Sequence, residues 1–108
     1  MATFNQLDVL AKDIAAKAFS SPDSSYTATL LSKGVEKCAK KFGEEAVELA
    51  LAAVLNKRDD TTKEAADVLY HLLVLLQVSG VSPAAVMDEL KRREGTSGLV
   101  EKASRKND

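Results

Sequence analysis

Apolar positions recur at steps of three and four residues along most of the chain, which is the spacing of amphipathic helices. The first series covers residues 4–18, with Thr3 placed to cap the helix. A serine-rich loop follows over residues 19–25, and "YTATLLSKG" then predicts a short helix that Gly34 closes. No stretch alternates between apolar and polar residues as a strand would, so the pattern predicts an all-α fold.

Three further helices are predicted in the rest of the chain. One covers residues 35–55, a polar break spans residues 56–61, and the next helix covers residues 61–79. The last begins at Ser82, which is a good cap and is followed by a proline, and it ends near Gly95. The pattern therefore predicts a bundle of about four to five helices.

These elements predict one helical domain over residues 1–95 and a polar tail over residues 96–108. The helix over residues 61–79, which Gly80 ends, carries alanine, valine and leucine around nearly its whole circumference. Such a helix must be covered on several sides, and a chain of 108 residues has few helices to do so. We therefore expect a homodimer in which a second copy covers part of this helix.

Composition and charge restrict the partners and the compartment. The net charge of −1 gives no indication of nucleic acid or a membrane as partner, and we expect neither. The longest apolar stretch, residues 68–78, is too short to span a bilayer. A single cysteine, Cys38, excludes an internal disulfide and suits a reducing compartment. Because no signal peptide is visible at the N-terminus, we expect a cytoplasmic protein.

Three glutamates stand close together in the otherwise apolar stretch "KKFGEEAVELAL". They are Glu44, Glu45 and Glu48. On a helix they form a stripe at the border of the apolar face, and Lys41 and Lys37 continue this stripe toward the N-terminus. A simpler interpretation is a solvated face that Lys40 and Lys41 neutralise at four-residue spacing. Gly43 within the same helix costs about 1 kcal/mol relative to alanine, which indicates close helix packing or a local bend.

The following helix places two acids and the only histidine on one apolar side. Glu64, Asp67 and His71 share this side, where a carboxylate must take up a proton, pair with a base or bind a cation. Simpler interpretations exist for two of them: Glu64 forms a capping box with Thr61, and His71 is a hydrogen-bonded core residue. Asp67 is harder to explain, because aspartate is a poor helix former inside an apolar helix.

The two acidic pairs have the spacings E-x-x-E and E-x-x-D, so each pair forms surface neighbours on its helix. On facing helices they would surround a small volume with carboxylate oxygens, which are ligands suited to Mg²⁺ or Mn²⁺. The neighbouring lysines then point to a metal-bound polyphosphate. A symmetric hairpin about residues 57–59 would offset the pairs by roughly 7 Å. Inclined helices, an asymmetric loop or a neighbouring subunit would each close that gap.

The combined pattern E-E-x-x-E followed by E-x-x-D resembles that of the MazG-like, all-helical nucleoside triphosphate pyrophosphohydrolases. Within that superfamily the chain resembles the phosphoribosyl-ATP pyrophosphohydrolase family. The narrower match lies in "SYTATLLSKG", "KCAKKFGEEAVELALAA", "KEAADVLYHLLVLL" and "GVSPAAVMDELKRR". Together these stretches cover most of the chain from Ser25 onward. Cys38 occupies a position at which the family pattern leads us to expect an aliphatic residue.

The resemblance implies hydrolysis of phosphoribosyl-ATP to phosphoribosyl-AMP and pyrophosphate, the second step of histidine biosynthesis. The implied ligands of Mg²⁺, for which Mn²⁺ would substitute, are Glu45, Glu48, Glu64 and Asp67. Glu44 would then orient or deprotonate the attacking water. Lys41 would meet the phosphate oxygens with help from Lys37, while Lys33 and Tyr26 would hold the phosphoribosyl end.

Two other functions are compatible with the same residues. One is a house-cleaning enzyme that applies this metal centre to a (deoxy)nucleoside triphosphate. The stretch "SYTATLLSKG", which separates the phosphoribosyl-ATP enzymes from their relatives, argues against it. The other is a non-enzymatic helical interaction module in which the acids serve only as surface charge.

Overall fold

The computed structural model describes residues 1–95 and 98–105, and within them the protein is all-α, as predicted. The described residues contain six α-helices, one short 3₁₀ helix and no strand. These are α1 (Asn5–Lys17), η1 (Pro22–Ser24), α2 (Tyr26–Ser32), α3 (Val35–Val54), α4 (Arg58–Ser79), α5 (Pro83–Arg92) and α6 (Gly98–Ser104). No single helix in this described part is both long and apolar enough to cross a membrane.

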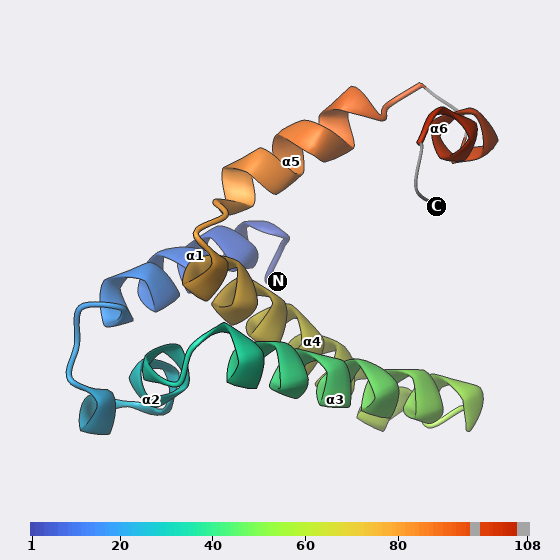
Figure 1. The fold of residues 1–108 in the computed structure, drawn as a ribbon. Coiled ribbons are helices and arrows are strands. Elements are labelled where there is room, and N and C mark those ends of the chain that lie inside the picture. Colours follow the sequence, from blue (N-terminus) through green and yellow to red (C-terminus); the bar gives the residue numbers. More distant parts are fainter. Residues whose placement is uncertain (96–97, 106–108) are drawn as a thin grey trace.

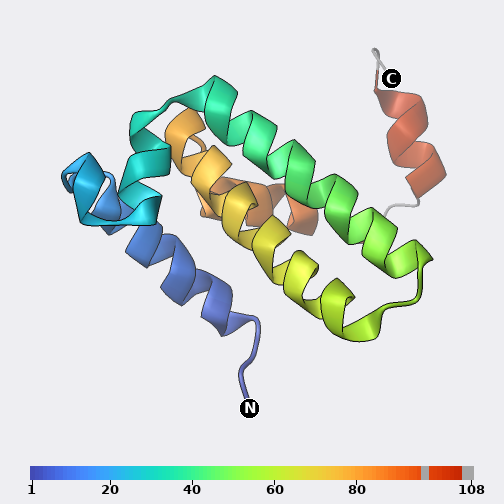
Figure 2. The ribbon, with the colours of Figure 1, turned by 90° about the horizontal axis from the view of Figure 1, so that it is seen from below.

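The antiparallel pair of α3 and α4 is the centre of the molecule, and α1 and α2 pack against the C-terminal half of α4 (Figures 1 and 2). The core lies where these four helices meet. Each contributes one buried residue to it: Ile14, Leu30, Cys38 and Val74. Because this core is small, the position of each helix depends strongly on a few contacts.

Short-range signals set the boundaries of α2. The Ser25 hydroxyl accepts a hydrogen bond from the Ala28 N–H at 3.0 Å, which caps the N-terminus of the helix. The helix ends at Ser32, slightly before the glycine expected to close it. Gly34 instead precedes the first residue of α3 with φ of 88° and ψ of 179°, a conformation that essentially only glycine adopts without strain. This glycine therefore determines how α2 and α3 are joined.

The first helix begins near its predicted start, but its cap differs. Phe4 occupies the cap position and its side chain makes no capping hydrogen bond. The Thr3 hydroxyl instead accepts a hydrogen bond from the Asn5 N–H at 3.3 Å. Thr3 therefore does form a hydrogen bond with the first turn of the helix, as expected.

The connection between α3 and α4 is shorter than predicted, because α4 starts at Arg58 and not at Thr61. Two acids in the first turn, Asp59 and Asp60, favour this early start through the helix dipole. The loop is therefore residues 55–57 only. Thr61 lies inside the helix, where its hydroxyl donates to the Lys57 carbonyl at 2.7 Å. It is not a helix cap, so the capping-box interpretation of Glu64 is wrong.

The C-terminal helices extend away from the bundle. Gly80, in the left-handed conformation, ends α4 as predicted, and the Ser82 hydroxyl caps α5 by accepting from the Ala85 N–H at 3.1 Å. The axis of α5 turns by 107° from that of α4, so α5 projects from the body (Figure 1). The stretch expected as a polar tail contains α6, a helix too short for its periodicity to be recognised. Residues 96–97 and 106–108 of that stretch lie outside the described residues.

Candidate active site

Three of the predicted metal-ligating carboxylates meet within a single chain. Glu45 and Glu48 on α3 and Glu64 on α4 each offer one oxygen, and these oxygens lie within 4.8 Å of one another. The short loop between α3 and α4 explains why these oxygens lie close together. Because it is centred on Asn56 and not on residue 58, it shifts α4 along α3 by about 6 Å relative to the expected hairpin. No neighbouring subunit is required to bring these three groups together.

The carboxylate of Glu64 is in an unfavourable position when charged. Its Oε2 atom is buried and has no hydrogen-bond partner among the described residues. Burial raises the pKa of Glu64 above its ordinary value, and the charge of Glu48 and a hydrogen bond of the protonated carboxyl with Glu48 raise it further. The charges of Glu45 and Asp67 act in the same direction. A buried anionic oxygen in this position requires either a proton or a cation. The donor set, made of hard carboxylate oxygens, fits a divalent ion such as Mg²⁺.

Asp67, the fourth predicted ligand, lies beside this group without joining it. Its carboxylate is not part of the set that meets within 4.8 Å, although its charge acts on both Glu64 and His71. An aspartate side chain is one methylene shorter than that of glutamate and therefore reaches less far from α4. Three of the four acids are thus brought together, and the fourth lies next to them.

His71 lies close to the carboxylates and is 5% exposed. Burial lowers its pKa; the charges of Glu45 and Asp67 raise it, and that of Lys41 lowers it. The residue is part of the interior, as its simpler interpretation predicts. Its Nδ1 atom, however, is buried without a hydrogen-bond partner in the described structure.

The basic residues and Glu44 surround this centre from α3. Lys41 is half-buried and close enough for its charge to act on His71, whereas Lys37 and Glu44 are exposed. Within the described part of the chain, neither Lys40 nor Lys41 forms an ion pair with the glutamates. The interpretation of these acids as a lysine-neutralised face therefore has no support in the structure.

The short helix α2 meets α4 through two tyrosines. Tyr26 and Tyr70 stack with ring centroids 6.4 Å apart and planes inclined by 19°. The hydroxyl of Tyr70 also shares a hydrogen bond of 2.5 Å with that of Thr27. No sequence motif singles out Tyr70, although its position three residues after Asp67 places it near the acidic side of α4. Lys33 lies exposed at the opposite end of α2.

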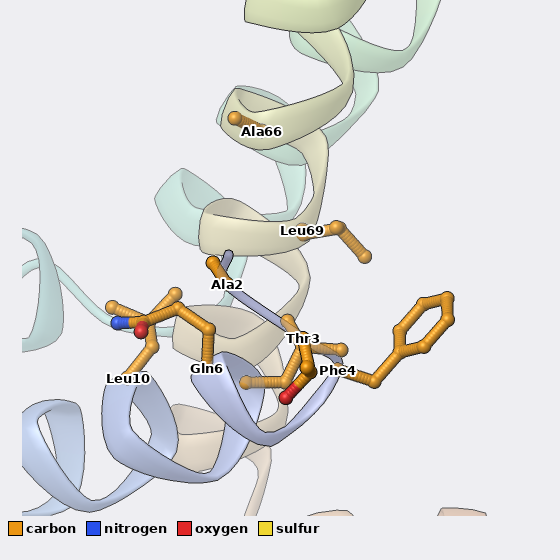
Figure 3. Close-up of a pocket in the computed structure, with 8 residues that line it drawn as sticks. Ala2, Thr3, Phe4, Gln6, Leu10, Ala66 and Leu69 are labelled. Atoms are coloured by element: carbon orange, nitrogen blue, oxygen red, sulfur yellow. The ribbon is translucent and has the colours of Figure 1, made fainter.

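An apolar pocket of about 430 Å³ lies between the N-terminus of the chain and α4 (Figure 3). Ala66 and Leu69 line it from α4, on the side of that helix away from Glu64. No charged residue contributes to its walls. It is therefore unsuited to a phosphorylated ligand, and the carboxylate group on α3 and α4 is the better candidate for the active site.

Comparisons with known proteins identify the family of this chain. The family model described as phosphoribosyl-ATP pyrophosphohydrolase matches residues 7–94. A phosphoribosyl-ATP pyrophosphatase of Dinoroseobacter shibae is 62% identical over 85% of this chain and 90% of its own length. Proteins of the same name from Cereibacter sphaeroides and Paracoccus denitrificans are 58% and 57% identical, over 92% and 90% of this chain and 96% and 90% of their own lengths. The chain therefore belongs to the phosphoribosyl-ATP pyrophosphohydrolase family.

Proposed function

We propose that this protein hydrolyses phosphoribosyl-ATP to phosphoribosyl-AMP and pyrophosphate, the second step of histidine biosynthesis. Membership of the family and the names of its relatives support the choice of substrate. The observation that carries the chemistry is the buried, unpartnered Oε2 of Glu64 beside two further carboxylates. When ionised, such an arrangement is unfavourable without a cation and is stabilised by one.

The proposed cofactor is Mg²⁺, with Mn²⁺ as a substitute. Glu45, Glu48 and Glu64 would hold the ion, and Asp67 would complete the acidic surroundings. When bound, such an ion polarises phosphate oxygens and lowers the pKa of water. The protein supplies the hard oxygen ligands that this chemistry needs.

The other site residues act on water and phosphate. Glu44, exposed one residue before the ligands, orients the attacking water and accepts its proton. The water oxygen bonds to the phosphorus atom that remains in phosphoribosyl-AMP, and pyrophosphate leaves with the electrons of the broken P–O bond. The Lys41 ammonium, with help from Lys37, stabilises the charge that develops on this leaving group. Lys33 and Tyr26 hold the phosphoribosyl end.

Replacing one ligand tests this proposal. We expect Glu48→Gln to reduce kcat for phosphoribosyl-ATP by at least about 100-fold, because it removes an anionic ligand without changing the size of the side chain. Calorimetric titration with Mn²⁺ should show weaker binding, while circular dichroism stays that of the parent. Glu36 is an exposed acid in the first turn of α3, so Glu36→Gln is the matched control. This variant should change neither kcat nor the affinity for Mn²⁺.

Parental turnover in Glu48→Gln would contradict the ligand assignment. A panel of nucleotides with Mg²⁺ separates the two enzymatic alternatives, since a stronger preference for a simple (deoxy)nucleoside triphosphate would indicate a house-cleaning enzyme. A parent protein that binds Mn²⁺ no better than scattered carboxylates do would indicate a non-enzymatic module.

We further propose a homodimer. An apolar groove of about 390 Å³ lies between α1, α4 and α5, and large side chains at its edges are open to solvent. Phe4, Leu69 and Met87 are 89%, 40% and 55% exposed. Because α5 projects from the body and carries the exposed Leu90 three residues after Met87, a second copy offers both the area and the apolar chemistry needed to cover the groove.

We also propose a cytoplasmic location. The proposed substrate is a nucleotide-derived metabolite, and Cys38 is a free, buried cysteine. The free cysteine suits a reducing compartment.

A further inference from the structure

Three rings form a row from the carboxylates to α2, which we call the aromatic row: His71, Tyr70 and Tyr26. The ring of His71 meets that of Tyr70 edge-on, with centroids 5.0 Å apart. The ring of Tyr70 in turn stacks on that of Tyr26 at 6.4 Å. His71 follows Asp67 by four residues and Glu64 by seven in α4, so one end of the row lies on the side of α4 that carries the candidate metal centre. The other end lies at the first residue of α2.

Tyr26 is the open end of this row. It is 58% exposed although one side of its ring faces Tyr70, so much of the ring remains accessible. An accessible aromatic face beside a polyphosphate site is suited to stacking with a purine, because every base has a flat π-face. Tyr26 is two ring-to-ring steps, of 6.4 Å and 5.0 Å, away from His71.

Tyr26 needs external support to hold this place. It stands on α2, a helix of seven residues, and a helix this short is not stable by itself. The support comes from Tyr70 in two ways: its ring packs on Tyr26, and its hydroxyl bonds that of Thr27, the next residue along the chain. Thr27 is buried, so this hydrogen bond is shielded from water.

The far end of α2 has a separate anchor. The Cys38 thiol donates a hydrogen bond to the Leu30 carbonyl at 3.3 Å. Loss of the Tyr70 hydroxyl should therefore release mainly the first turn of α2, where Tyr26 stands, and leave the rest of the helix attached to α3.

We propose that Tyr26 stacks on the purine ring of the substrate and that Tyr70 is a positioning residue, which holds Tyr26 in place through its ring and through Thr27. The identity of the nucleotide rests on the proposed function. Tyr26 thereby recognises the base itself, and Tyr70 links the α2 segment to the helix that carries Glu64 and Asp67.

Steady-state kinetics test the stacking face. We expect Tyr26→Ala to raise KM for phosphoribosyl-ATP roughly 10-fold to 100-fold, the size of a lost aromatic–base stack, with kcat changed little. Tyr26→Phe keeps the ring and should restore most of the affinity. Phe19→Ala removes an exposed ring from the loop before α2 and should leave KM unchanged.

The positioning role is tested by removing hydroxyl groups. Tyr70→Phe and Thr27→Val should each raise KM about threefold to tenfold, and the double variant should be no worse than either, because both changes break the same hydrogen bond. Mn²⁺ affinity should stay that of the parent. Lower thermal stability with parental KM would show a purely structural hydrogen bond and would overturn the positioning role.

Binding without turnover gives an independent measurement. The chain has two tyrosines and no tryptophan, so its tyrosine emission comes from the aromatic row alone. Phosphoribosyl-AMP should quench the tyrosine emission of the parent but not that of the Tyr26→Phe variant, in which only Tyr70 emits. Ribose 5-phosphate with pyrophosphate, which lacks a base, should not quench the emission of the parent. Equal quenching by both would overturn the stacking role. A parent protein that fails to hydrolyse phosphoribosyl-ATP would contradict the proposed function instead. The titration requires no turnover, so it tests the stacking role separately from the proposed function.

Discussion

Glu64 is placed where function and stability make opposite demands. Its raised pKa means that the folded protein holds a proton more tightly than the unfolded chain, in which the group titrates near its ordinary 4.5. Above that pH the unfolded state binds fewer protons, so the free energy of unfolding falls as pH rises through the raised pKa. The charged form destabilises the metal-free fold, and a bound cation would offset this effect.

Removing the charge of Glu64 should therefore stabilise the protein in the absence of metal. We expect Glu64→Gln to raise Tm above that of the parent at pH 8 in the presence of a chelator, and the difference should shrink as pH falls toward 4.5. Thermal unfolding followed by circular dichroism at several pH values measures this. Added Mn²⁺ should stabilise the parent more than the variant. A variant less stable than the parent at pH 8 would contradict the electrostatic argument.

The helices of this protein are joined by short links that determine how far each helix is displaced along its neighbour. Asn56 has a positive φ of 58°, which asparagine tolerates better than most residues, and it centres the tight turn between α3 and α4. Gly34 makes the corresponding link between α2 and α3. These two positions place the carboxylates of α3 relative to α4 and the tyrosine of α2 relative to both.

Two glycine substitutions should act in opposite directions. A Cβ at Gly34 or at Gly43 would meet no atom within 4 Å, so only backbone conformation distinguishes the sites. Gly34→Ala forces alanine into a conformation with φ of 88° and should destabilise the fold by about 1–3 kcal/mol. Gly43→Ala lies in regular helix and should stabilise it by about 1 kcal/mol. Urea denaturation measures the change in the free energy of unfolding for each variant. Changes of the same sign in the two variants would show that packing outweighs backbone strain.

The same measurement bears on why Gly43 is a glycine. The sequence indicated close helix packing or a bend at this position. Among the described residues no neighbouring atom lies within 4 Å of the place of its Cβ, so the packing explanation fails inside one protomer.

The whole molecule leaves a large apolar area uncovered. The groove between α1, α4 and α5 lies on the side of the bundle away from the carboxylates, and α4 is apolar there as well as toward the core. The expected need for a second copy follows from this excess of apolar helix surface over the number of helices available to cover it. Assembly and chemistry would then occupy different sides of α4.

Light scattering during gel filtration checks the assembly. We expect the parent to have twice the mass of the 11.6 kDa chain. Introducing charge into the groove with Leu69→Glu and Met87→Glu together should yield the monomer mass, because two buried carboxylates in each copy would lose solvation. Phe19→Ser, which removes an exposed apolar residue outside the groove, should remain dimeric. A monomeric parent would contradict the proposal.

Much of the fold was predictable because its signals are local. The helix periodicity, the Ser82–Pro83 start of α5 and the end of α4 at Gly80 were predicted and are confirmed. The start of α4 was predicted three residues late, because the polar residues 58–60 resemble a loop in composition while their acids favour a first helical turn. The helix α6 was missed because seven residues hold too few turns to show a period.

Local patterns were enough to predict that the chain is helical and which acids share a helix side, since both depend on residues within a few positions of one another. Packing between helices is what brings Glu48 and Glu64 together, leaves Asp67 beside them and lets Tyr70 bond Thr27. These outcomes depend on how far one helix is displaced along another and on which atoms become buried between them. Residues 43 positions apart come into contact only through that packing, for which no local pattern codes.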